Sequence, residues 1–126
     1  MNKIILAVIA IVVVIAGVIL FKGPAQTTTP VVQITPKETT IIITKSGFEP
    51  KTITIKIGTK VIWKNDSGDL TNVSSAVHPT HQVYPPLNLD NIVAGQTVSL
   101  VFDKAGTYNY HNHLDAAQEG VVEVIE

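Results

Sequence analysis

Apolar and polar residues alternate along most of the chain beyond residue 38, and this pattern predicts β-strands. In residues 52–57 the side chains of Ile53, Ile55 and Ile57 fall on one face, as expected for a strand with one buried side. Other predicted strands cover residues 39–44, 60–64, 96–102, 106–113 and 121–125. Short strands joined by turns indicate an all-β fold, an antiparallel sandwich or barrel.

The alternation stops between residues 70 and 91. This stretch contains Tyr84-Pro85-Pro86 and has no consistent period, so it is predicted to be a long loop. A loop of this length in a small domain is usually functional or disordered. Across residues 38–126 the only hint of helical periodicity lies at residues 114–118.

The N-terminal part of the chain has a different composition. Residues 4–21 form an unbroken apolar run, long enough to cross a bilayer as a helix at about 1.5 Å per residue. Lys3 precedes the run and favours a cytoplasmic N-terminus with the remainder exported. We therefore expect residues 1–22 to be an N-terminal transmembrane helix, a membrane anchor or uncleaved signal. A cleaved signal peptide is the alternative.

Residues 23–37 are rich in Thr and Pro and are predicted to be a flexible linker. The remainder, residues 38–126, is predicted to be a single domain, near the size at which one core suffices without disulfides. This organisation places the protein in the cell membrane as a single-pass protein, with its globular domain on the extracytoplasmic side. The N-terminal helix makes the membrane its first expected partner.

The charged residues are unevenly distributed, although the net charge is only −1. From Asp66 onward the only Lys is Lys104, whereas acidic residues recur to the C-terminus. An acidic half attracts cations and repels nucleic acid, so no nucleic-acid partner is expected. The chain has no Cys, which excludes a thiolate nucleophile, a zinc ribbon and an iron–sulfur cluster.

Four histidines lie in this acidic half, in two tight pairs. His111 and His113 are two residues apart on a predicted strand, so their side chains project from the same side. His78 and His81 lie in the long loop, where the intervening Pro79 limits backbone freedom. If the loop folds over the strand end, three or four imidazole nitrogens converge. Such a set suits copper, zinc, nickel or iron, and Asp115 is a further candidate ligand or hydrogen-bond partner.

The domain resembles the cupredoxins across residues 39–126. The resemblance is carried by Gly47-Phe48-Glu49-Pro50, by Val61-Ile62-Trp63-Lys64-Asn65-Asp66, by Ala105-Gly106-Thr107-Tyr108-Asn109-Tyr110-His111 and by Gly120-Val121-Val122-Glu123-Val124. It implies a Greek-key β-sandwich with copper near one end.

The usual blue-copper ligands of that family are absent. The resemblance places Thr71 where the first His is expected, Asn112 at the Cys, Asp115 at the second His and Gln118 near the Met. Blue-copper sites depend on a copper–thiolate bond, so an ordinary site of that type is not expected.

The histidine pairs are instead similar to the His-Pro-x-His and Tyr-His-x-His motifs of multicopper oxidases. They imply copper bound by His78, His81, His111 and His113.

Three functions follow from these observations. The first is a membrane-anchored, copper-binding protein with a His-rich, type 2-like site, which acts in copper handling or electron transfer with a redox or copper-transfer protein partner. The second is a metal-free interaction domain on the same fold, in which the four histidines lie too far apart to share an ion. The third is a small type 2 copper oxidoreductase, although enzyme activity is not the favoured expectation.

Overall fold

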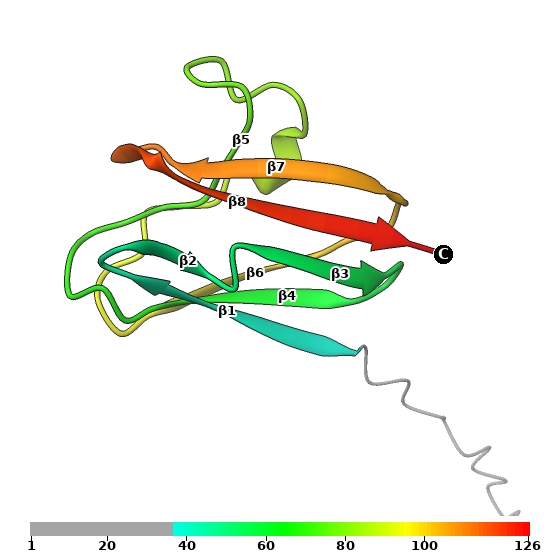
Figure 1. The fold of residues 1–126 in the computed structure, drawn as a ribbon, viewed down its shortest axis with the longest axis horizontal. Coiled ribbons are helices and arrows are strands. Elements are labelled where there is room, and N and C mark those ends of the chain that lie inside the picture. The colour runs from blue at the N-terminus through cyan, green and yellow to red at the C-terminus, as the bar shows by residue number, and fades with distance from the viewer. Residues whose placement is uncertain (1–36) are drawn as a thin grey trace, which may run out of the picture. The chain divides into compact units, whose positions relative to one another are not determined.

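The computed structural model describes residues 37–126, which form two β-sheets (Figure 1). The first sheet contains, in spatial order, β2 (Gly47–Glu49), β1 (Glu38–Thr44), β4 (Lys60–Asn65) and β6 (Thr97–Val101). The second contains β3 (Thr52–Lys56), β8 (Asp115–Ile125), β7 (Gly106–Asn112) and β5 (Ser74–Ser75). The all-β sandwich expected from the sequence is confirmed.

One short 3₁₀ helix, η1 (Pro85–Leu87), interrupts the stretch between β5 and β6. Within residues 37–126 no helix is long and apolar enough to span a membrane. The predicted transmembrane helix at residues 1–22 and nearly all of the predicted linker at 23–37 lie outside the described residues.

The two sheets enclose a hydrophobic core built from alternate strand positions. In β1, Ile41 and Ile43 are fully buried, and in β4 the same holds for Val61 and Trp63. Strands β2, β3, β7 and β8, the helix η1 and the connecting segments supply the remaining buried apolar side chains: Phe48, Ile55, Val73, Leu87, Ile92, Phe102, Tyr110, Val122 and Val124. The described domain therefore has a core of its own, without disulfides.

Strand direction differs from the expected all-antiparallel arrangement. β1 pairs in parallel with β4, and β3 pairs in parallel with β8. The alternation of apolar residues specifies which face of a strand is buried, but it carries no information about the direction of the neighbouring strand. The chain enters the second sheet between β1 and β4, and this crossover makes parallel pairing possible.

The stretch predicted as a long loop is anchored to the core at several points. Val73 and Leu87 are fully buried, and the Leu89 N–H donates to the Val73 carbonyl at 2.9 Å. Between β5 and η1 the chain extends past β7 at the edge of the second sheet (Figure 1). Residues 114–118 are not helical, because β8 begins at Asp115 and pairs there with β7.

Candidate metal centre

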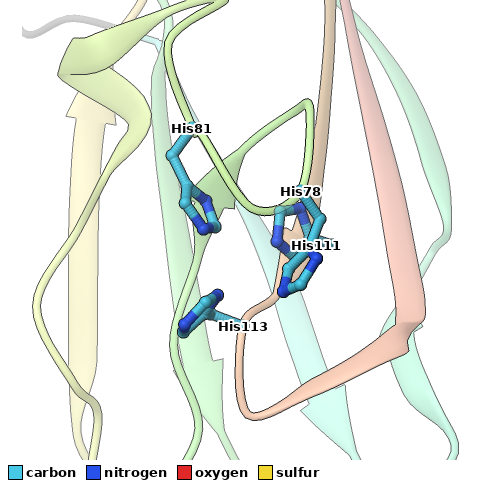
Figure 2. A group of neighbouring side chains, drawn as sticks. All are labelled: His78, His81, His111 and His113. Carbon is cyan, nitrogen blue, oxygen red and sulfur yellow. The ribbon is translucent and has the colours of Figure 1, made fainter.

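Four imidazole rings converge at this edge of the second sheet (Figure 2). His78, His81, His111 and His113 each offer one ring nitrogen, and these four atoms lie within 4.8 Å of one another. A four-coordinate ion bonded at about 2.0 Å requires nitrogens about 3.3 Å apart in a tetrahedron, or about 2.8 Å (cis) and 4.0 Å (trans) apart in a square plane. Small inward movements of the rings therefore suffice to bind one ion, and the structure brings together all four predicted residues.

Strand β7 positions one half of the cluster. Tyr110 points into the core with 1% of its surface exposed, so the side chain of the next residue, His111, lies on the opposite face. The β7–β8 ladder has a register shift between His111 and Asn112, and β7 ends at Asn112. His113 thus lies just beyond the strand, but its ring still faces the cluster (Figure 2).

Hydrogen bonds hold the loop that carries the other half. The His81 N–H donates to the Val77 carbonyl at 2.9 Å, and the Asn88 side-chain amide donates to the His81 carbonyl at 2.8 Å. Asn88 also accepts the Ser75 N–H at 3.0 Å, which ties the loop to β5. His81 has a φ of 55°, a left-handed conformation that is uncommon outside glycine, and these bonds stabilise it.

The ring of His81 is oriented by a backbone carbonyl. Its Nδ1 lies 3.2 Å from the Ser75 carbonyl oxygen. A carbonyl only accepts hydrogen bonds, so Nδ1 carries the proton and the neutral ring has its lone pair on Nε2. Metal-bound histidines are commonly fixed in this way by a partner on the second nitrogen.

His111 is the most buried member of the cluster. Only 4% of its surface is exposed, and its buried Nε2 has no hydrogen-bond partner among the described residues. Burial lowers the pKa of His111 below its ordinary value, and positive charge on His81, His78 and His113 lowers it further. Glu119 acts in the opposite direction. The neutral form, which binds metals, is therefore favoured.

The ring separations show a flattened arrangement. The two histidines within each sequence motif are the most distant from each other, with ring centroids 5.8 Å apart for His78–His81 and 6.3 Å apart for His111–His113. The four separations between the motifs are shorter, from 4.6 to 5.4 Å. A regular tetrahedron would make all six equal, whereas a square plane lengthens two trans separations. The cluster lies between these limits.

A network of side-chain amides supports the turn after β7. The His113 N–H donates to Asn72 Oδ1 at 2.7 Å, and the Leu114 N–H donates to Asn112 Oδ1 at 3.1 Å. Asn112 in turn donates to Gln118 Oε1 at 3.1 Å. Asn72 and Asn112 are both buried. The network therefore fixes the backbone that presents His113.

A comparison with known families decides the relationship. A family described as "Cupredoxin-like domain" matches residues 8–124 of the chain. The chain belongs to the cupredoxins. A plastocyanin from Scenedesmus fuscus is 34% identical to this cupredoxin over 89 residues, which are 61% of this chain and 85% of the plastocyanin.

Solved cupredoxin structures have the same fold. A purple cupredoxin from Nitrosopumilus maritimus is 25% identical, with a TM-score of 0.60, and the match covers 68% of this chain and 98% of that one. A Cu(I) form of an amicyanin variant is 28% identical, with a TM-score of 0.58, over 70% of this chain and 82% of the amicyanin.

The positions that the resemblance assigned to blue-copper ligands do not belong to the histidine cluster. Thr71, Asn112, Asp115 and Gln118 line a separate cavity of about 200 Å³. Asp115 accepts the Ala117 N–H at 3.3 Å and is not part of the cluster, so its expected role as a ligand is not supported. With an amide in place of the thiolate, the residues present do not fit a blue-copper ion.

Sequence reasoning missed the residues that hold the histidines in place. Asn72 supports His113, while the Ser75 carbonyl and the Asn88 amide position His81. Their bonds span up to 41 positions along the chain, so no local spacing reveals them. One sequence feature could have pointed to Asn72: it precedes the apolar Val73, which is fully buried. An amide that is buried beside such a residue requires hydrogen-bond partners.

Proposed function

We propose that this cupredoxin is an extracytoplasmic copper-binding protein, anchored in the cell membrane, that acts in copper handling or electron transfer. His78, His81, His111 and His113 would bind the ion, and a redox or copper-transfer protein would be its partner. The observation that carries the proposal is the convergence of four imidazole nitrogens within 4.8 Å. His111 is the buried member of the set, and its Nε2 has no hydrogen-bond partner among the described residues, so a bound ion would offset the hydration that this ring has lost.

The family and the cluster geometry both favour copper. The amicyanin variant mentioned above is a Cu(I) form, so copper binding occurs on this fold. Zinc in structural sites is almost always tetrahedral, whereas Cu(II) with nitrogen ligands prefers a square or tetragonal arrangement. The four rings have two long and four short centroid separations, whereas a regular tetrahedron has six equal ones. This departure is in the direction of the square arrangement that Cu(II) prefers.

Convergence of the rings argues against the metal-free alternative. That alternative required the four histidines to lie too far apart to share an ion, and their ring nitrogens are within 4.8 Å. Without a thiolate, the bound copper would lack the intense blue absorption of a type 1 site.

Copper titration of the fragment comprising residues 34–126 tests the proposal, since this compact unit contains the whole described core. One equivalent of Cu(II) should give an electron paramagnetic resonance signal with nitrogen hyperfine splitting and no intense blue band. Failure to bind one equivalent tightly would leave a cupredoxin fold without its metal and would contradict the proposal.

Replacing Asn72 with alanine should weaken copper binding without removing a ligand. The His113 N–H would lose its acceptor at 2.7 Å, and the turn that presents the His113 ring would relax. We expect about a tenfold loss in copper affinity, typical of changes to groups that orient ligands. The free energy of unfolding should fall by about 1 to 2 kcal/mol, measured by urea denaturation of the metal-free fragment.

Asn91 provides the matched control, because it is exposed and bonds to the opposite end of the Asn72 amide. Asn72 Nδ2 donates to Asn91 Oδ1 at 3.3 Å, whereas the His113 N–H donates to Asn72 Oδ1. Asn91→Ala should leave copper affinity within about twofold. If Asn72→Ala lowers stability but leaves affinity unchanged, Asn72 stabilises the fold and does not position His113.

A further inference from the structure

A second cavity adjoins the histidine cluster on the outer face of the second sheet. Its volume is about 330 Å³, and both His78 and His111 form part of its wall. The rest of the lining comes from β7, β8 and the segments beside them: Lys51, Ala76, Val77, Asn109, Tyr110, Ala116, Glu119, Gly120 and Val121. Any ion bound by the four histidines would therefore lie beside this cavity.

One residue of the cavity wall has a buried polar atom that the protein leaves unsatisfied. His111 is 4% exposed, and its Nε2 has no hydrogen-bond partner among residues 37–126. Several other wall groups, including Ala76, Val77 and Ala116, are apolar. A small ligand with little hydration suits such a mixed surface.

Lys51 and Glu119 are the only charged side chains in the cavity lining. Both are exposed, and no ion pair joins them in the described part of the chain. The Lys51 carbonyl accepts the Val121 N–H at 2.8 Å, which fixes its backbone to β8. Glu119 is paired with His111 across the β7–β8 ladder. The charges of Lys51 and Glu119 cancel. A divalent ion bound by four neutral imidazoles would therefore give the site a net positive charge.

We propose that this cavity binds a small monovalent anion beside the metal, and that the Lys51 ammonium attracts it. The inference rests on the proposed function, because the excess positive charge comes from the ion. The attraction acts at the rim of a partly enclosed cavity, where it is stronger than in bulk water. The Glu119 carboxylate opposes it, and anion binding should therefore depend on these two side chains with opposite signs.

Azide titration of the copper-loaded fragment 34–126 tests the inference. Azide should perturb the electron paramagnetic resonance spectrum and add a charge-transfer absorption band that saturates. Lys51→Gln should raise the azide Kd about three- to tenfold, and Glu119→Gln should lower it by a similar factor. Neither residue is among the four proposed copper ligands.

Lys56→Gln is the control, because Lys56 lies at the other end of β3 and does not line the cavity. Its azide Kd should match that of the unmodified fragment. Equal azide affinity in all variants would place the anion elsewhere on the copper and overturn the inference. Copper binding without any azide response would overturn this inference alone, whereas failure to bind copper would overturn the proposed function as well.

Discussion

Replacing both His111 and His113 with alanine is expected to abolish tight copper binding. The two residues supply half of the ligand set, and they come from the rigid strand side of the cluster. Disturbing groups that only orient a ligand typically costs about 10- to 100-fold in affinity, so removing two ligands should cost more than about 100-fold. Competition with a copper chelator of known affinity, followed by electron paramagnetic resonance, measures the change.

Asn109→Ala is the control for this experiment, because Asn109 is exposed on the same face of β7 but lies outside the cluster. It should leave copper affinity within about threefold. Circular dichroism of the metal-free double variant should show an intact β-fold. Unchanged copper affinity in the folded double variant would rule out the four-histidine site.

Replacing Gly120 with alanine should strongly destabilise the domain. A methyl group there would overlap Cζ of Tyr110 and lie 2.7 Å from its Cε2. The Tyr110 ring has no room to withdraw, since it is 1% exposed and packs against Phe48 and Trp63 with centroids 4.7 and 5.6 Å away. Overpacking of this kind costs about 3 kcal/mol. Thermal unfolding should show a Tm lower by about 15 °C for a domain of this size.

Two further variants separate steric overlap from backbone strain. Gly58 has a φ of +84°, and beyond its two chain neighbours no described residue has an atom within 4 Å of the position that an alanine methyl would occupy, so Gly58→Ala introduces strain without overlap. It should cost about 1 kcal/mol. In a Tyr110→Leu background, the additional cost of Gly120→Ala should fall to about 1 kcal/mol, because the obstructing ring is gone. An undiminished cost would show that Tyr110 is not the cause.

Much of the fold followed from the alternation of apolar residues. The positions of Ile41, Ile43, Val61 and Trp63 in the core agree with a period of two. The short strands β2 and β5 were not predicted, because two or three residues are too few to show a period. The parallel direction of the β1–β4 pair also could not be inferred, since it depends on how the chain crosses between sheets.

The candidate site was predictable in residue identity but not in geometry. Strand spacing placed His111 and His113 on one side, and both rings do face the cluster. The approach of His78 and His81 depends on bonds from Ser75 and Asn88, whose loop conformation no spacing rule specifies. The neighbouring cavity was also invisible in the sequence, because Lys51 and Glu119 are far apart along the chain.

The histidine-bearing loop also protects the edge of a sheet. β5 is only two residues long, and the chain beyond it continues to cover β7 through the Ala76 N–H, which donates to the Asn109 carbonyl at 2.9 Å. An uncovered strand edge pairs readily with another chain and leads to aggregation. Shortening the loop would therefore endanger solubility as well as the metal centre, so the length of the loop is constrained by two independent requirements.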